Sequence, residues 1–175
     1  MRRHELTESQ WNRIRDLLPP ERKAQGGSPA KDNRMVMHGI LYWLNTGVAW
    51  RDLPERFGPW QSIYTRYRRW TWQGIWENIL AYFDLTGKTV ICDKGYDSDK
   101  LVSYIIRRGG YAIIPSRCTS THPRETDWHV YKERHLVENL FLKMKNRRRF
   151  ATRYEKSATS FFAVSLLAAI LVWLS

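Results

Sequence analysis

The chain has 175 residues, 43% of them hydrophobic, which is enough for one or two small domains with a buried core. Its 29 Lys and Arg exceed its 17 Asp and Glu, and the formal net charge of +12 favours a polyanionic partner, either nucleic acid or an anionic membrane surface. Two cysteines are too few for a disulfide framework and favour a reducing cytosol. The segment "MRRHELTESQ" has no apolar run behind its basic residues, so we expect a cytoplasmic protein without a signal peptide.

The first 47 residues predict two helices joined by a polar loop. Thr7 and Gln10 have the spacing of a capping box, and the helix that they begin is expected to stop at the Pro19–Pro20 pair. After the loop at residues 21–33, the apolar segment "NRMVMHGILYWLNTG" predicts a buried helix that ends at Gly47.

Residues 48–74 predict a short helix, a turn at "FGP" and a second helix from about Trp60. This layout is typical of a helix-turn-helix DNA-binding unit. The second helix mixes aromatic residues with Arg66, Arg68 and Arg69, which we interpret as DNA-binding, although a basic surface over an aromatic core would show the same pattern. Most tryptophans here are expected to be core anchors, namely Trp43, Trp50, Trp60, Trp70, Trp72 and Trp76.

The pattern changes after a further helix that ends near Phe83. "KTVIC" at 88–92 and "YAIIPSR" at 111–117 predict strands, and the segment between them predicts a helix, so the three form a βαβ unit. The sequence therefore predicts an α+β fold with a helical DNA-binding domain at 1–83 and an α/β domain at 88–175. The apolar segment at 161–174 is shorter than the ~20 residues of a membrane span, and a buried helix is the favoured interpretation over a tail anchor.

One segment of the second domain places four polar side chains on one helical face. The intervals between Tyr131, Arg134, Glu138 and Lys145 are three, four and seven residues. A solvated ladder of ion pairs and a phosphate-handling metal site both fit this spacing. Asp93 follows the first predicted strand, and together with Glu138 it can hold a divalent cation.

Two neighbouring groups have competing interpretations. The run Arg147–Arg149, which includes Arg148, is either a solvated face or, as we favour on a nucleic-acid enzyme, a strip that contacts phosphates. A zinc site is an alternative with no standard ligand spacing, and its candidate ligands are Cys118, His122, His129 and His135.

Five segments together resemble one known family. "LTESQWNRIRDLLPP", "GILYWLNTGVAWRDLPERFGPW", "DKGYDSD", "YKERHLVENLFLKMKNRRRFATRYEK" and the closing apolar helix are similar to successive blocks of bacterial insertion-element transposases of the DDE class, in the insertion-sequence-five group of the insertion-sequence-four superfamily. The tyrosine–arginine–glutamate–lysine signature of that group is filled by Tyr131, Arg134, Glu138 and Lys145.

The resemblance implies a fold, a reaction and partners. The second domain is expected to be ribonuclease-H-like, with Asp93 and Glu138 as the second and third acids of a catalytic triad that binds Mg²⁺, for which Mn²⁺ can substitute. Arg134 and Lys145 would contact phosphates at the transposon end, with Tyr131 beside them. The implied reaction is nicking at terminal inverted repeats in double-stranded DNA, followed by strand transfer.

The chain departs from this family pattern between its two domains. The family's first acid belongs to a block of three strands and a helix before "VICDKGYDSD", and only Asp84 and a turn stand in that place here. We therefore expect an internal deletion, an incomplete ribonuclease-H-like domain and impaired catalysis. The alternative is a non-catalytic DNA-binding remnant or a repressor, which would associate with itself or with intact transposase.

Overall fold

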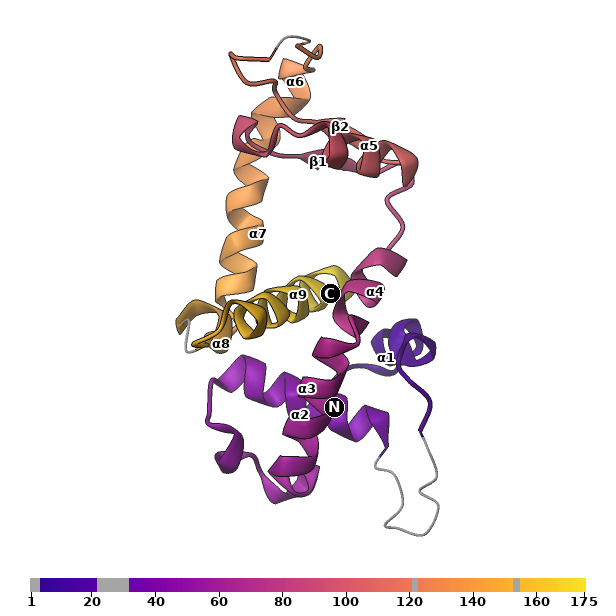
Figure 1. The fold of residues 1–175 in the computed structure, drawn as a ribbon, viewed down its shortest axis with the longest axis vertical. Helices are drawn as coiled ribbons and strands as arrows, with labels where there is room; N and C mark the ends of the chain where they lie inside the picture. Colours follow the sequence, from indigo (N-terminus) through magenta and orange to yellow (C-terminus); the bar gives the residue numbers. More distant parts are fainter. Residues whose placement is uncertain (1–3, 22–31, 121–122, 153–154) are drawn as a thin grey trace. The chain divides into compact units, whose positions relative to one another are not determined.

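The computed structural model describes residues 4–21, 32–120, 123–152 and 155–175. For residues 134–137 it describes the backbone but not the side chains. Figure 1 shows the order of the elements along the chain. Their bounds are α1 (Glu8–Ile14), α2 (Asn33–Thr46), α3 (Trp60–Trp72), α4 (Ile75–Tyr82), β1 (Thr89–Ile91), α5 (Asp99–Arg107), β2 (Tyr111–Ile113), α6 (Trp128–Tyr131), α7 (His135–Lys145), α8 (Arg148–Thr152) and α9 (Ala158–Leu174).

The chain divides into two compact units. The first unit contains residues 1–82 together with 143–175, and the second contains residues 83–142. The C-terminal helices α8 and α9 thus pack with the N-terminal helices, whereas the sequence analysis groups residues 143–175 with the α/β domain. The division falls inside α7, between Leu142 and Lys143.

Local sequence signals explain where the first helices begin and end. The Thr7 hydroxyl accepts from the Gln10 backbone amide and the Gln10 side chain accepts from the Thr7 amide, so the capping box is present. Gly47 ends α2 in the left-handed conformation, with φ of 74°. The short helix expected after Gly47 is wrong, because this segment forms two 3₁₀ turns, at Trp50–Asp52 and Glu55–Phe57.

Aromatic side chains form the centre of the first unit. Trp43, Trp70 and Trp76 are completely buried. The Trp43 ring stacks on Trp50 at 4.1 Å between centroids, and Trp70 meets Trp76 edge to face at 5.7 Å. The core-anchor prediction holds for these tryptophans, but it is wrong for Trp72, whose side chain is 73% exposed.

The last helix completes this core. α9 is apolar around its whole circumference, a pattern that requires burial on several sides, and it packs against α4, while α8 packs against α2. Val164, Leu167 and Ala168 are fully buried there. None of the helices in the described part of the chain is long and apolar enough to cross a membrane.

The second unit contains a small parallel sheet. β1 and β2 pair in parallel, with Val90 opposite Ala112, and α5 connects them, which confirms the predicted βαβ order. Val102 and Ile105 of α5 form the core together with Ile114. Among the described residues the sheet has these two strands, so each strand has a single hydrogen-bonded neighbour. The fold is mostly helical with a small sheet, in agreement with an α+β class.

Candidate active site and nucleic-acid interface

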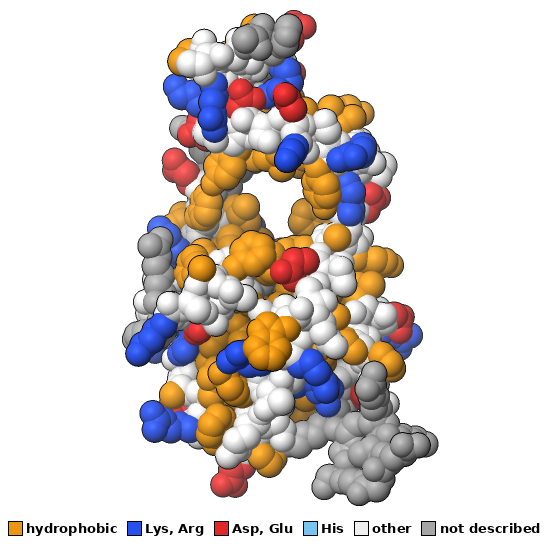
Figure 2. Space-filling view, in the orientation of Figure 1, with side chains coloured by type: hydrophobic (Ala, Val, Ile, Leu, Met, Phe, Trp, Pro, Cys, Tyr) orange, Lys and Arg blue, Asp and Glu red, His pale blue; other side chains and the backbone are white. Residues whose placement is uncertain are grey.

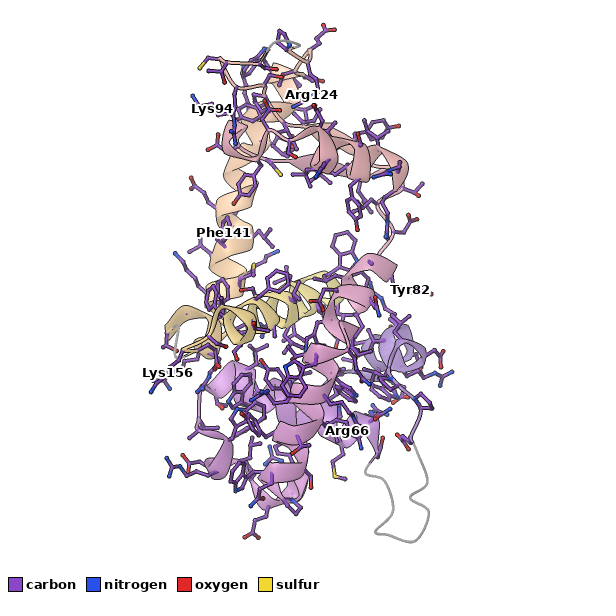
Figure 3. All side chains as sticks on the ribbon, viewed as in Figure 1. Arg66, Tyr82, Lys94, Arg124, Phe141 and Lys156 are labelled. Atoms are coloured by element: carbon purple, nitrogen blue, oxygen red, sulfur yellow. The ribbon has the colours of Figure 1, made fainter. Side chains whose placement is uncertain are left out.

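A pocket of about 420 Å³ lies within the second unit, alongside β1. Its lining is mostly apolar and includes two carboxylates. The lining residues are Val90, Ile91, Cys92, Asp93, Tyr96, Glu138, Leu140 and Phe141. Phe141 extends from α7 (Figure 3). The structure therefore brings Asp93 and Glu138, which are far apart in the sequence, to one pocket.

Both acids are placed by the ends of regular elements. Asp93 follows β1 and caps a 3₁₀ turn, with its Oδ1 accepting from the Lys94 backbone amide at 2.8 Å. Glu138 lies in the first turn of α7, and both carboxylates are exposed to solvent. Burial raises the pKa of the Cys92 thiol, another lining residue of the pocket, so this side chain stays a neutral thiol at neutral pH.

The pocket meets the requirements of a divalent cation only in part. Carboxylate oxygens are the ligands that Mg²⁺ prefers, and Mg²⁺ commonly retains several waters. In the part of the chain that the structure describes, however, no group of three His, Cys, Asp or Glu residues is placed to hold an ion. Among the described residues, Asp93 and Glu138 thus form at most a partial ligand set.

Asp84 does not complete this set. It precedes β1, whereas Asp93 follows the strand, so the two acids belong to opposite ends of β1. The Asp84 carboxylate accepts from the Thr86 amide at 3.0 Å and from the Thr86 hydroxyl at 2.7 Å. These hydrogen bonds lower the pKa of Asp84 and fix its role as a turn residue.

An arginine clamp orders the loop that follows Asp93. The Arg124 guanidinium bridges Asp97 and Asp99, and the Asp97 side chain is only 10% exposed. Asp97 also accepts from the Arg117 amide at 2.7 Å, and Arg117 in turn donates to the Gly95 carbonyl at 2.8 Å. Arg124 is labelled in Figure 3. The sequence did not predict this clamp, and the only hint of it was the presence of Arg117 and Arg124 in the loop after β2.

The proposed four-residue face is not carried by one continuous α-helix. Tyr131 ends α6, Arg134 belongs to a 3₁₀ turn at Lys132–Arg134, and α7 carries Glu138 and Lys145. The four residues thus belong to three consecutive elements, of which only α7 carries two of them. Tyr131 packs edge to face against Trp128 at 5.5 Å, and the Arg134 side chain lies outside the described residues.

The arginines after α7 form two kinds of contact in the first unit. Arg147 is half-buried and donates to Asn45 Oδ1 at 3.0 Å, and burial lowers its pKa. Arg149 donates to the Gly47 carbonyl at 3.2 Å and pairs with Glu155 at 2.9 Å. Arg148 between them is exposed, with its aliphatic part beside Gly47. Arg147 and Arg149 therefore bind protein groups, whereas Arg148 and Lys145 are exposed.

The three α3 arginines also differ from one another. Arg66 donates to Asn33 Oδ1 at 2.6 Å, and burial together with the nearby Arg69 charge lowers its pKa. Arg66 thus links α3 to the start of α2 (Figure 3). Arg68 is half-buried beside exposed Trp72, with 4.7 Å from its guanidinium carbon to the ring centroid, and Arg69 is exposed.

The zinc alternative gains no support from the described residues. Cys118 and His129 are exposed, and the described part of the chain contains no cluster that could hold a metal ion. His122 lies outside the described residues, as does the side chain of His135.

Comparison with known protein families decides the identity of the two halves. Residues 6–80 match a family described as "Putative transposase of IS4/5 family", and residues 90–175 match the family "Transposase DDE domain". The chain belongs to the IS4/5 transposases with a DDE domain. The resemblance to insertion-element transposases is therefore confirmed, and the DDE domain implies a ribonuclease-H-like fold for the second half.

Individual relatives of this transposase family agree with that assignment. A protein of Brucella ovis named "Putative transposase for insertion sequence element IS6501" is 40% identical over 86 residues, which is 49% of this chain and 66% of the relative. "Insertion element IS402 uncharacterized 16.2 kDa protein" of Burkholderia cepacia is 35% identical over 74 residues, 39% of this chain and 50% of the relative.

A third relative, "Uncharacterized protein y4sN" of Sinorhizobium fredii, is 38% identical over 76 residues, 43% of this chain and 60% of the relative. The transposase chain thus spans between half and two thirds of the length of the curated relatives that it matches. No solved structure matches the chain significantly.

Proposed function

We propose that this chain is an insertion-sequence transposase that binds double-stranded DNA at the terminal inverted repeats of its element and is impaired in cleaving it. The observation that carries this proposal is the pocket beside β1, which unites Asp93 and Glu138 without a third acidic partner among the described residues. The family membership supplies the reaction class, which is nicking at a transposon end followed by strand transfer.

DNA binding is assigned to the helical residues 1–83. α2 and α3, with the 3₁₀ turns between them, resemble a helix-turn-helix arrangement, and α3 would approach the DNA. Arg68 and Arg69 are available for phosphate contact, while Arg66 orients α3 through Asn33. The net charge of +12 adds a sequence-independent attraction to DNA.

In the second unit, Asp93 and Glu138 would hold a divalent cation. The bound ion would supply electrostatic stabilisation of charge at the scissile phosphodiester. Arg134 and Tyr131 of the family signature would contact phosphates in this unit, and Lys145 and Arg148 would contact DNA phosphates from the first unit. Arg147 contributes by positioning α8 against α2, because its guanidinium donates to Asn45.

The incompleteness of the catalytic domain is inferred from the connection between the helices and the sheet. Residues 83–88 alone join α4 to β1, which is too short for the three strands and the helix that the family pattern places there. A two-metal displacement needs a cation beside both the entering and the leaving oxygen, and two exposed carboxylates fix such a pair poorly. We therefore expect DNA binding to persist while strand cleavage is weak.

A nicking assay on labelled transposon-end DNA tests this proposal. The parent chain is expected to cleave near background in Mg²⁺ or Mn²⁺, because each 1.36 kcal/mol of lost stabilisation slows the step about tenfold. Asp93→Ala and Glu138→Ala should then change little, and Glu133→Ala serves as an exposed control in the same unit. Efficient cleavage by the parent that both variants abolish would show that another acid completes the triad.

A second candidate function is repression of the intact transposase. The first unit has its own aromatic core and contains most of the DNA-binding candidates, so it can occupy transposon ends without chemistry. Adding this chain to an intact transposase should then lower end nicking as its concentration rises. An unchanged nicking rate at concentrations that saturate the DNA would contradict this function.

A further inference from the structure

The DNA contacts proposed above leave two aromatic side chains of α3, Tyr64 and Trp72, without a role, and Arg68 lies between them in an aromatic ladder. Tyr64, Arg68 and Trp72 follow one another at intervals of four residues, so they occupy successive turns of one helical face. The Arg68 guanidinium donates to the Tyr64 hydroxyl at 3.0 Å and lies 4.7 Å from the centroid of the Trp72 ring. The two contacts hold a cation between two aromatic side chains.

The Tyr64 end of this ladder packs against the core of the first unit, and the Trp72 end is exposed to solvent. The Tyr64 ring packs on Trp50 at 5.5 Å, and Trp50 stacks on the completely buried Trp43. At the other end, the Trp72 side chain is 73% exposed. Arg68 covers part of the indole, so a preordered aromatic surface faces solvent with a cation behind it.

The surroundings of Trp72 are suited to a nucleic acid. Arg69 is exposed next to Arg68, and Figure 2 shows hydrophobic side chains lying among Lys and Arg on the visible face of the first unit. A flat indole flanked by cations is the combination that stacks a base while holding its phosphates. Bases inside a duplex have both faces covered by their neighbours, whereas an unpaired base has a free face.

We propose that Trp72, supported by Arg68 and Tyr64, is a stacking site for an unpaired base next to the duplex that α3 binds. This inference rests on the proposed DNA binding and adds a preference for duplex DNA that ends in a single-stranded extension. Trp72 would bind the base, and Arg68 and Tyr64 would act as positioning residues for the indole. A frayed or nicked DNA end is the form of DNA that offers such a base.

The test compares a blunt duplex with the same duplex carrying a short single-stranded overhang, using the full chain and fluorescence anisotropy. The parent should bind the overhang DNA about tenfold more tightly, in keeping with the free energy of stacking one base. A 2-aminopurine placed at the first unpaired position should lose fluorescence on binding. Trp72→Ala should abolish both the preference and the quenching, while blunt-duplex affinity stays within about twofold.

Two further variants sharpen the result. Trp72→Phe should retain most of the preference because it keeps a flat ring, and Tyr82→Ala, which removes another exposed aromatic of the first unit, should change nothing. Equal affinity of the parent for the two DNAs would overturn the stacking site. Quenching that survives in Trp72→Ala, or a loss of affinity in Trp72→Ala that is equal for both DNAs, would overturn it as well. Failure of the parent to bind even the blunt duplex would instead overturn the proposed DNA-binding function, and the stacking site with it.

Discussion

The two units of this chain differ in the core that stabilises each of them. In the first unit, helices from both ends of the sequence surround Trp43, Trp70 and Trp76, which are completely buried. In the second unit, the core consists of Val102, Ile105 and Ile114, with a few partly buried neighbours. Large apolar side chains remain on its surface, including Tyr96, Ile106, Tyr111 and Trp128.

This difference matters because burial of apolar area is the main source of folding free energy. A two-stranded sheet with one covering helix buries little, and both of its strands leave an unpaired edge among the described residues. The second unit therefore depends more on polar contacts, above all on the arginine clamp around Asp97. The comparison teaches that the first unit has an extensive aromatic core, while the second unit has a small aliphatic one.

The largest expected effect comes from opening the core of the first unit. Trp43→Ala removes the ring that stacks on Trp50 and lies beneath the Arg149 guanidinium, and it should lower the free energy of unfolding by about 3–5 kcal/mol. Urea unfolding followed by circular dichroism measures this. Trp72→Ala is the matched control and should change stability by less than about 0.5 kcal/mol, because Trp72 is 73% exposed. Equal losses in the two variants would show that the aromatic core does not dominate this unit.

The next effect tests the contact that joins α8 to the end of α2. Arg149→Ala should cost about 2–3 kcal/mol, because it leaves Glu155 without its cation and removes a donor from the Gly47 carbonyl. Both side chains of this pair are only 14% exposed, so solvent replaces the partner poorly. Arg149→Lys should recover only part of the loss, since an ammonium cannot contact both the carboxylate and the ring in the same way.

Lys156→Ala, at an exposed position nearby, is the control for this measurement. A double variant with Trp43→Ala should be less destabilised than the two single losses added together, because Arg149 lies 4.7 Å over the Trp43 ring. Strict additivity would contradict a shared contact between α2 and α8.

These contacts mark the limit of what the sequence could predict. The capping box at Thr7, the Gly47 end of α2, the start of α3 at Trp60 and the parallel pairing of the two strands all follow from local signals, and the structure confirms them. Arg149 was instead assigned to a run that contacts phosphates. Nothing in the spacing of three consecutive arginines shows that two of them bind protein groups on α2, because that depends on which helix α8 packs against.

The candidate site shows the same division. The strand-end position of Asp93 and the helical position of Glu138 could be read from the sequence, and the structure places both acids at one pocket. The single α-helix expected from Tyr131 to Lys145 was wrong, because a 3₁₀ turn at Lys132–Arg134 interrupts it, while the shared role of its four residues stays a prediction. The pairing of Asp97 with Arg124 could not be read from the sequence, because the two residues are 27 positions apart.

The third prediction concerns the second unit and should be smaller. Asp97→Asn removes the charge that holds Arg124 and weakens the acceptor for the Arg117 amide, so it should cost about 1–2 kcal/mol. Asp99→Asn removes the other carboxylate bound by Arg124, but its side chain is 95% exposed, and the loss should stay below about 0.5 kcal/mol. Hydrogen exchange of the β1 and β2 amides distinguishes this local loss from unfolding of the first unit. A larger effect in Asp99→Asn would place the clamp on the wrong carboxylate.

The smallest effect is a pH dependence in the first unit. His38 of α2 lies 4.0 Å from the Glu5 carboxylate, yet its pKa is lowered from 6.5, because burial outweighs the attraction of Glu5 and Asp32 and the nearby Arg34 lowers it further. The unfolded chain therefore binds a proton more readily than the folded chain. Stability should be complete above about pH 6.5 and should decline as pH falls toward the lowered pKa of the folded state.

His38→Gln removes this titration while keeping a polar side chain of similar length. We expect the variant to lose less stability than the parent when urea unfolding is repeated at about pH 7.5 and about pH 5. The difference between the two pH values is the quantity to compare, because it cancels any constant cost of the substitution and the contributions of the other histidines. A parent that becomes more stable on acidification relative to His38→Gln would mean that the Glu5 pairing dominates over burial. The first unit would then rely on an ion pair at this point of its core, which would narrow the contrast with the second unit.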